Sequence, residues 1–222
     1  MEENRITGYA KIREYDGDYF ERLVETLNSL SRREIQSLID RFSSVIHEER
    51  NIFVIGNGGS AATASHLATD IGIGLLRVGL KSRIVSLREN SAILSAVGND
   101  TDFRLVFASQ LRVVANKGDL LVVISASGNS ENLVEAISRA KDMKLHTVAL
   151  VGFDGGVIKG MVDTCVHVPT AIGEYGIVED IHLSLTHLLK EELIKDKLLD
   201  ENEFVSVYFC KLISQSANPI TS

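Results

Sequence analysis

The chain has 222 residues, of which 45% are hydrophobic, and a formal net charge of −7. These values suit a globular protein with one full core, and the scattered basic residues exclude a dedicated surface for nucleic acid or anionic membrane. No apolar run approaches the ~20 residues that span a bilayer, and the charged start differs from a signal peptide. We therefore expect a cytoplasmic protein with no nucleic-acid and no membrane partner, in which local dipoles and hydroxyls would bind any anion.

Two amphipathic helices are expected ahead of the first strand. In the second helix, Ser31 and Glu34 form a capping-box pattern, and six apolar residues then recur at helical spacing. The apolar stripe must be buried, and a neighbouring subunit is one place that would bury it. The stripe consists of Ile35, Leu38, Ile39, Phe42, Val45 and Ile46.

Strand-like and helical patterns alternate after this pair. The alternation and the connecting lengths predict an α/β fold, with a five-stranded parallel sheet flanked by helices on both faces. Strands are expected near 51–56, 82–87, 119–125, 146–151 and 163–168, and helices near 60–72, 101–115, 130–143 and 177–197. We expect a single domain over 1–222, made of N-terminal helices 17–48, an α/β core 50–197 and a C-terminal tail 198–222.

A serine-rich turn at residues 125–130 (Ser-Ala-Ser-Gly-Asn-Ser) follows one strand and opens the next helix. It offers hydroxyl donors, a glycine that lets a ligand approach the backbone, and the free N–H groups of a helix N-terminus. Residues 56–60 (Gly-Asn-Gly-Gly-Ser) form a similar turn after the first strand. Both turns would lie at the carboxyl ends of neighbouring strands, which predicts a phosphate-monoester site there. The alternative is that Ser130 only caps its helix and the other serines satisfy their loop.

Two helices bear residues suited to proton transfer or metal binding. His66 and Asp70, at spacing i, i+4, share one face of the helix near 60–72, where they could share a proton or a cation or simply form a solvated pair. On the helix near 177–197, His187 projects from the side opposite the apolar stripe. That side also bears apolar residues, as an intersubunit pocket would require.

Two more residues of the helix near 177–197 need separate interpretation. Glu179 lies about 80° around the helix from His187, between the polar side and the stripe. His182 lies at the edge of the apolar stripe and is expected to be structural.

These motifs, in this order, resemble the sugar isomerase (SIS) domain proteins, and among them the phosphoheptose isomerases. The resemblance covers residues 20–197. It depends on the two glycine and serine turns, on His66, and on three further motifs. These are Gly98-Asn99-Asp100, Asp154-Gly155-Gly156 and the helix Glu179-Asp-Ile-His-(x)4-His187.

The resemblance implies a flavodoxin-like three-layer sandwich and a homotetramer with active sites between subunits. The implied activity is the conversion of sedoheptulose 7-phosphate to an aldoheptose 7-phosphate through an enediol, for nucleotide-heptose and surface-polysaccharide synthesis. Asp70 and His187 match the catalytic residues, and some members bind one zinc per subunit at positions matched by His66, Asp70, Glu179 and His187, whereas others require no cofactor. The implied substrate-binding residues are Asn57, Gly58, Ser60, Asn99, Asp100, Ser125, Ala126, Ser127, Ser130 and Glu179.

The chain departs from the family pattern at several of these positions. Related isomerases have glutamate in place of Asp70, glutamine in place of Glu179, and an arginine where this chain reads Gly72-Ile-Gly74. Two rival interpretations therefore stay open, a non-catalytic SIS regulator or assembly factor that binds a sugar phosphate, and an isomerase of a hexose phosphate. Retention of both Asp70 and His187 favours an enzyme, because a binding protein would need neither.

Overall fold

The computed structural model describes residues 18–200. Seven α-helices and five β-strands form this part of the chain. Their bounds are α1 Asp18–Ser29, α2 Arg32–His47, β1 Asn51–Gly56, α3 Gly58–Arg77, β2 Arg83–Ser86, α4 Ser91–Asp100, α5 Val106–Val114, β3 Leu120–Ser125, α6 Glu131–Asp142, β4 His146–Val151, β5 Thr164–His167 and α7 Tyr175–Asp200. Short 3-10 helices lie at Phe103–Leu105 and Ile158–Gly160. None of the helices described is both long enough and apolar enough to cross a membrane.

The five strands form one parallel sheet in the order β2-β1-β3-β4-β5, as the alternating pattern predicts. The register pairs Val54 of β1 with Val122 of β3, and Val122 with Val148 of β4. The chain leaves β1 toward one edge of the sheet and returns to β3 on the other side of β1. The carboxyl ends of β1 and β3 are therefore the topological switch point, where open α/β sheets bind ligands.

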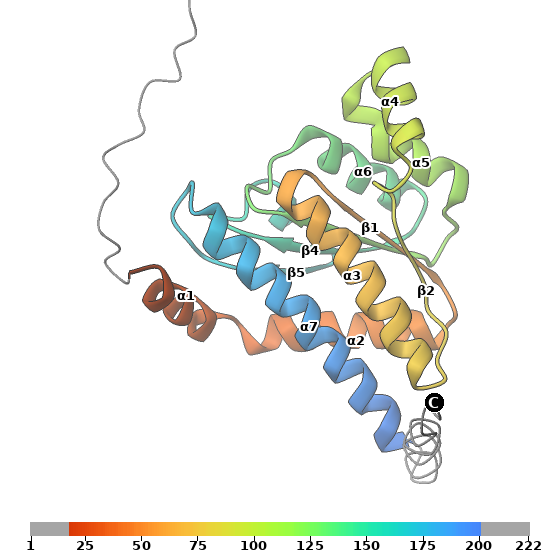
Figure 1. Ribbon diagram of the computed structural model, residues 1–222. Helices are drawn as coiled ribbons and strands as arrows, with labels where there is room; N and C mark the ends of the chain where they lie inside the picture. The colour runs from red at the N-terminus through yellow and green to blue at the C-terminus, as the bar shows by residue number, and fades with distance from the viewer. Residues whose placement is uncertain (1–17, 201–222) are drawn as a thin grey trace, which may run out of the picture.

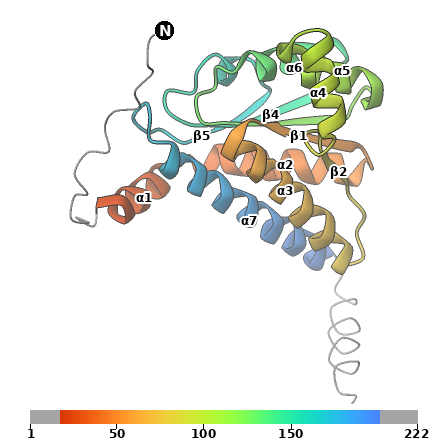
Figure 2. The ribbon, with the colours of Figure 1, turned by 45° about the horizontal axis from the view of Figure 1, so that its top comes forward.

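Helices cover both faces of the sheet, which gives three layers (Figures 1 and 2). Alternate residues of β1 supply the two cores: Ile52 and Val54 pack with α2, α3 and α7, whereas Phe53 and Ile55 pack with α5 and α6. This alternation follows from the period of two in a β-strand, and it lets one strand with a continuous apolar sequence fill both layers.

The apolar stripe of α2 is buried within this chain. Leu38 and Phe42 are fully buried in the core beside α3 and α7, so the expectation that a neighbouring subunit buries this stripe is wrong for α2. It stays open for α1, which has no buried residue. The Tyr19 hydroxyl of α1 donates a hydrogen bond to Asp180 of α7, with an O–O distance of 2.6 Å.

The capping box at the start of α2 is only half formed. The Ser31 hydroxyl accepts a hydrogen bond from the Glu34 backbone N–H at 3.3 Å, as the pattern predicts. The Glu34 carboxylate instead accepts a hydrogen bond from the backbone N–H of His167 on the edge strand β5. It thereby covers a donor that an edge strand would otherwise expose.

Residues 91–100 form the helix α4, which the sequence pattern did not predict. The Asn90 side chain caps α4 by accepting a hydrogen bond from Ile93 N–H, and no residue of α4 is fully buried. Periodicity therefore gives little sign of it, because the signal comes from burial of one face. The single helix expected over 101–115 is instead a 3-10 turn followed by α5.

Candidate functional site

A cavity of about 320 Å³ opens at the switch point of the sheet, beyond the carboxyl ends of β1 and β3. The N-termini of α3 and α6 both face it, and α7 closes one side. The cavity therefore combines two positive helix ends with hydroxyl groups. It is lined by Asn57, Gly58, Gly59, Ser60, Ile124, Ser125, Ala126, Ser127, Ser130, Leu133, Tyr175 and Glu179.

An amide pair joins the two helix ends. Asn57 holds the N-cap position of α3, but its side chain makes no cap hydrogen bond. It exchanges two hydrogen bonds with the side chain of Asn132 in the first turn of α6, at 2.9 and 3.0 Å. The first backbone N–H groups of a helix have no partner within the helix, so this pair fixes two sets of such donors side by side while leaving them free for a ligand.

The serines of the 125–130 turn have different roles. The buried Ser125 hydroxyl accepts a hydrogen bond from Gly128 N–H at 3.0 Å and so shapes the turn. Ser127 accepts a longer one, 3.4 Å, from Asn129 N–H. Ser130 holds the N-cap position of α6, yet its side chain makes no cap hydrogen bond. The interpretation that Ser130 merely caps its helix is therefore wrong, and Ser130 lines the cavity. The other half of that interpretation is confirmed for Ser125 and Ser127, which accept hydrogen bonds within their loop.

A second glycine turn, at residues 154–156 (Asp-Gly-Gly), packs against the serine turn. Gly128 has φ +64°, and a Cβ there would collide with the carbonyl of Gly155. The Asn129 side chain accepts a hydrogen bond from Val157 N–H at 3.0 Å, and Ile158 N–H donates to the Gly128 carbonyl at 3.0 Å. Glycine is required at this close approach because any side chain would separate the two turns.

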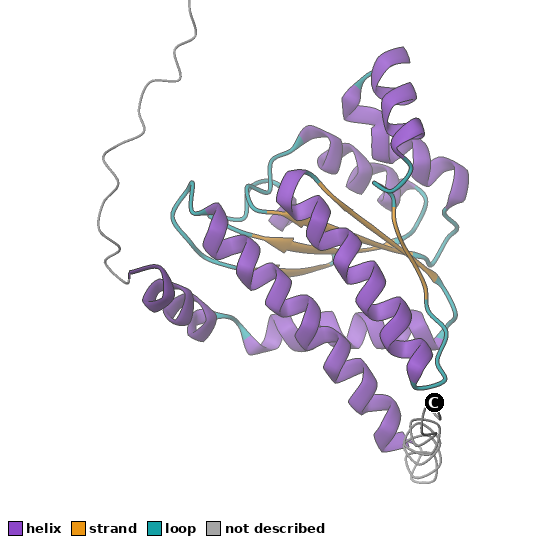
Figure 3. Cartoon of the chain, in the orientation of Figure 1, coloured by secondary structure: helices purple, strands orange, loops and turns teal. Residues whose placement is uncertain are grey.

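Three predicted residues meet between α3 and α7, which lie side by side (Figure 3). His66 Nε2 is 2.8 Å from His187 Nε2 and 3.3 Å from Asp70 Oδ2. His187 Nε2 is 3.7 Å from the same carboxylate oxygen. The Asp70 side chain is 24% exposed, so the group is reachable from solvent. An aspartate and a histidine from separate helices thus converge within one chain.

This group fits a divalent metal. The ligand atoms of His66, Asp70 and His187 lie within 4.8 Å of one another. Two imidazoles and one carboxylate form a donor set that zinc uses at catalytic sites, where a fourth position stays open for water or substrate. Glu179, the fourth predicted ligand, is not part of this group. Its carboxylate lies against Gly59 and lines the cavity instead.

The cavity and the histidine group are separated along both helices. His66 follows Ser60 by six residues on α3, and a rise of 1.5 Å per residue puts them about 9 Å apart along the axis. His187 follows Glu179 by eight residues on α7, which corresponds to about 12 Å. A ligand that contacts both places must therefore be an extended molecule.

Asn99 and Asp100 lie elsewhere. They occupy the exposed end of α4, which projects from the body of the chain (Figure 1), and neither lines the cavity. The Asn99 side chain donates a hydrogen bond to Asp100 Oδ1 at 2.8 Å. Within one chain, the structure does not bring them to the other predicted residues.

Asn132, Tyr175 and Lys190 are polar residues at the site that were not predicted from the sequence. Asn132 and Tyr175 line or support the cavity, and Tyr175 stacks edge-on against Phe153. Lys190 reaches Asp70, with 3.8 Å between Nζ and Oδ2. Its position three residues after His187 puts both on one helix face, a signal that helical spacing does contain. His182 is fully buried, which confirms its structural placement.

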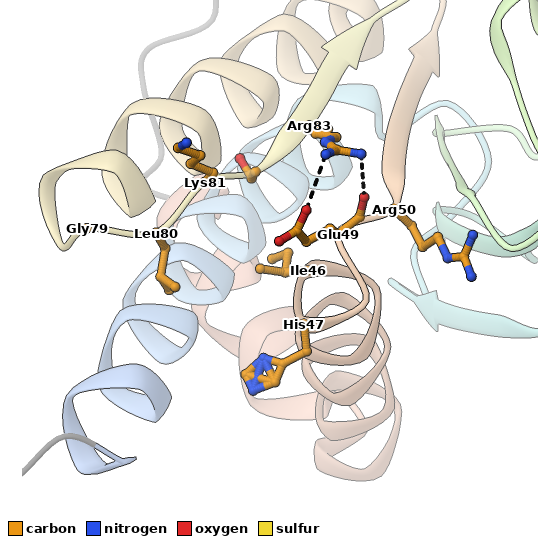
Figure 4. A pocket seen from close by; sticks show the side chains of 9 residues that line it. Ile46, His47, Glu49, Arg50, Gly79, Leu80, Lys81 and Arg83 are labelled. Carbon is orange, nitrogen blue, oxygen red and sulfur yellow. Dashed lines mark hydrogen bonds and ion pairs between the residues drawn. The ribbon is translucent and has the colours of Figure 1, made fainter.

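A larger cavity, about 550 Å³, lies at the opposite end of the strands from the first cavity (Figure 4). It is formed at the amino ends of β1 and β2, where the Arg83 guanidinium donates to the Glu49 carbonyl at 3.0 Å and to its carboxylate at 3.2 Å. Arg50 points away from this pair (Figure 4) and approaches Glu48. Because the charges of Arg83, Glu49 and Arg50 are already paired and parallel sheets bind ligands at the carboxyl ends of their strands, we assign the site to the smaller cavity.

Comparison with known proteins agrees with this geometry. The model of the SIS domain family matches residues 17–152. A probable phosphoheptose isomerase of Thermoplasma acidophilum is 32% identical over 77% of this chain and 93% of its own length. The phosphoheptose isomerase of Geobacter sulfurreducens is 37% identical over 71% of this chain and 84% of its own.

Solved structures give the same result. A phosphoheptose isomerase from Neisseria gonorrhoeae superposes with a TM-score of 0.73 at 30% identity, covering 80% of this chain and 95% of that one. One from Francisella tularensis gives 0.71 at 29% identity, covering 81% and 96%. The chain therefore belongs to the SIS domain proteins and, among them, to the phosphoheptose isomerase family.

Proposed function

We propose that the protein is an aldose–ketose isomerase that converts sedoheptulose 7-phosphate to an aldoheptose 7-phosphate through an enediol. The observation that supports it best is the meeting of Asp70 and His187, with 3.7 Å between Oδ2 and Nε2, at about 9 to 12 Å along the helices from the cavity at the N-termini of α3 and α6. Two relatives at 32% and 37% identity bear the name of this enzyme.

The phosphate would bind in the cavity between the N-termini of α3 and α6. Among residues 18–200, no lysine or arginine lines the cavity, so the attraction comes from the helix dipoles, the backbone N–H groups and the hydroxyls of Ser60, Ser127 and Ser130. The Glu179 carboxylate faces the same space. Because an ionised carboxylate only accepts hydrogen bonds, it suits a sugar hydroxyl rather than the phosphate.

The carbonyl end of the sugar would then extend along α3 and α7 toward the histidine group. Asp70 removes the proton from the carbon beside the ketone, and the electrons of that C–H bond form the C=C bond of the enediol while the ketone oxygen gains a proton. The proton returns to the former ketone carbon as the neighbouring hydroxyl oxygen loses its own and becomes the aldehyde. His187 is placed to donate and accept at these oxygens, which is general acid–base catalysis.

The reaction drawn above requires no cofactor, and the alternative that we also propose is one zinc ion per subunit at the same residues. His66, Asp70 and His187 would hold it, because their ligand atoms form a compact two-histidine and carboxylate set. When bound, zinc would act as a Lewis acid that polarises a sugar oxygen.

The finer biological setting is also proposed. A homotetramer would cover apolar side chains that α1 and the α4–α5 region leave exposed, such as Val24, Phe103 and Val113. It would also allow Asn99 and Asp100 to reach the site of another subunit. We place the enzyme in the cytoplasm, in the synthesis of nucleotide-heptose for surface polysaccharide. Sedimentation or light scattering of the purified protein tests the tetramer.

A panel of phosphorylated ketoses with five to seven carbons, assayed with and without a chelator, tests the activity. We expect turnover to be fastest with sedoheptulose 7-phosphate, and to be lost in Asp70→Asn and His187→Ala while phosphate-ester binding persists. Asp142→Asn and His47→Ala, both on exposed surfaces, are matched controls that keep full activity. Tight binding without turnover of any ketose would favour a regulator, and preference for a six-carbon substrate would favour a hexose phosphate isomerase.

A further inference from the structure

Lys190 is held beside the candidate catalytic carboxylate by the packing of α7 on α3. It lies one turn after His187 on α7, and its ammonium Nζ is 3.8 Å from Asp70 Oδ2. Its side chain is 25% exposed, whereas that of Lys195 on the same helix is 61% exposed. Lys190 therefore differs from a solvated surface lysine in both burial and partner.

A glycine in α3 makes room for the lysine stem. A Cβ at Gly74 would lie 3.1 Å from Lys190 Cγ and 3.2 Å from its Cδ, closer than most real contacts. At Gly72, two residues earlier, the nearest atom would be Ile84 Cγ2 at 3.6 Å, an ordinary contact. A glycine inside a helix costs about 1 kcal/mol relative to alanine, and the lysine stem is the neighbour that Gly74 accommodates.

The charges around Asp70 explain what the lysine does there. Two of its ion-pair partners, His66 and His187, are charged only when protonated. Lys190 is the third, and its ammonium supplies a cation independent of the histidines. Lys190 is also 3.4 Å from Glu191, whose side chain is 61% exposed, and exposed pairs contribute little. The contact with the half-buried Asp70 is therefore the one that orients both groups.

Building on the proposed function, we propose that Lys190 is a positioning residue for Asp70. Its ammonium holds the carboxylate toward His66 and His187, so that the oxygen that removes the substrate proton stays in place through turnover. Lys190 does not line the cavity that would bind the phosphate, so it acts on the carboxylate and not on substrate affinity. The same contact makes it a competitor of any metal ion that binds Asp70.

The test compares Lys190→Met, which keeps the stem and removes the charge, with Lys190→Arg and with Lys195→Met as a matched control. In chelator-treated protein, we expect Lys190→Met to lower kcat by about 10-fold to 100-fold, because small misplacements of a reacting group have effects of this size. KM should stay within about threefold of the original protein, since ground-state binding is unchanged. Lys190→Arg should lie closer to the original kcat, and Lys195→Met should match it. Far-ultraviolet circular dichroism and melting curves confirm that each variant is folded.

Zinc titration gives an independent readout. Removing the competing cation should raise the zinc affinity of Lys190→Met by about 10-fold, the effect of roughly 1.4 kcal/mol at one site, with no change in Lys195→Met. If the original protein turns over no ketose phosphate, the proposed function fails, and the zinc titration still tests the contact. A kcat within twofold of the original in folded Lys190→Met, or an unchanged zinc affinity, would overturn the role of Lys190.

Discussion

Removal of the imidazole at His182 should make the protein less sensitive to acid. His182 lies on α7 in the core, fully buried, and neither ring nitrogen has a hydrogen-bond partner in the structure. Burial lowers the pKa of His182 from 6.5 to about 4, and the nearby Val151 backbone opposes this only in part. The ring therefore stays neutral in the folded protein at pH values where the unfolded chain binds a proton.

The sign and size of the stability change follow from the difference between the pKa values of His182 in the folded and unfolded states. Well above pH 6.5 the His182 ring is neutral in both states, so its titration has no effect on stability. As the pH falls from 6.5 toward 4, His182 binds a proton in the unfolded chain but stays neutral in the folded protein. The free energy of unfolding therefore decreases. At about pH 5, protonation of the unfolded chain alone lowers the stability by about 2 kcal/mol.

The assay is urea unfolding of the original protein and His182→Leu at about pH 7.5 and about pH 5, near the two ends of this range. Other carboxylates and histidines titrate in both proteins, so the quantity compared is the stability that each protein loses between about pH 7.5 and about pH 5. We expect this loss to be about 2 kcal/mol smaller in His182→Leu than in the original protein. His47→Gln, which changes an exposed histidine, should lose as much stability as the original. Equal losses in the original and His182→Leu would refute the reasoning.

Two further predictions concern the serine turn. Gly128→Ala should lower the free energy of unfolding by about 2 kcal/mol or more and abolish phosphate-ester binding, because φ is +64° and the new Cβ meets the Gly155 carbonyl. Calorimetry measures both the stability and the binding. Gly160→Ala, which has open space at its Cβ, should change neither the stability nor the binding. Ser130→Ala should raise KM about 10-fold through loss of one hydroxyl on a charged group, without loss of stability, since this hydroxyl caps nothing. Ser31→Ala should behave in the opposite way, with a loss of about 1 kcal/mol of stability and no change in KM. A Ser130→Ala variant that loses stability but keeps its KM would contradict this assignment.

Local sequence patterns predicted much of the fold and part of the site. Alternating apolar runs gave the five-stranded parallel sheet, and the two turns at 56–60 and 125–130 lie at the ends of adjacent strands as expected. His66 and Asp70 share a helix face because a spacing of four residues is enough to decide it. These features depend only on short stretches of chain.

The remaining features depend on packing between distant segments. No local pattern predicts that the Glu34 carboxylate accepts a hydrogen bond from the backbone N–H of His167, 133 residues away, instead of capping α2. The approach of Lys190 to Asp70 requires the close packing of α3 on α7, which the backbone at Gly74 permits. The position of Glu179 beside Gly59, outside the histidine group, likewise follows from how these two helices cross.

Proton exchange with solvent tests the central claim most directly. With sedoheptulose 7-phosphate in deuterium oxide, the proton held by a solvent-accessible carboxylate exchanges with solvent in part of the turnovers. Deuterium then enters at the carbon beside the carbonyl, which proton magnetic resonance detects as loss of a signal. We predict incorporation by the original protein and none by Asp70→Asn. Isomerisation without incorporation, or equal incorporation by Asp70→Asn, would contradict the account.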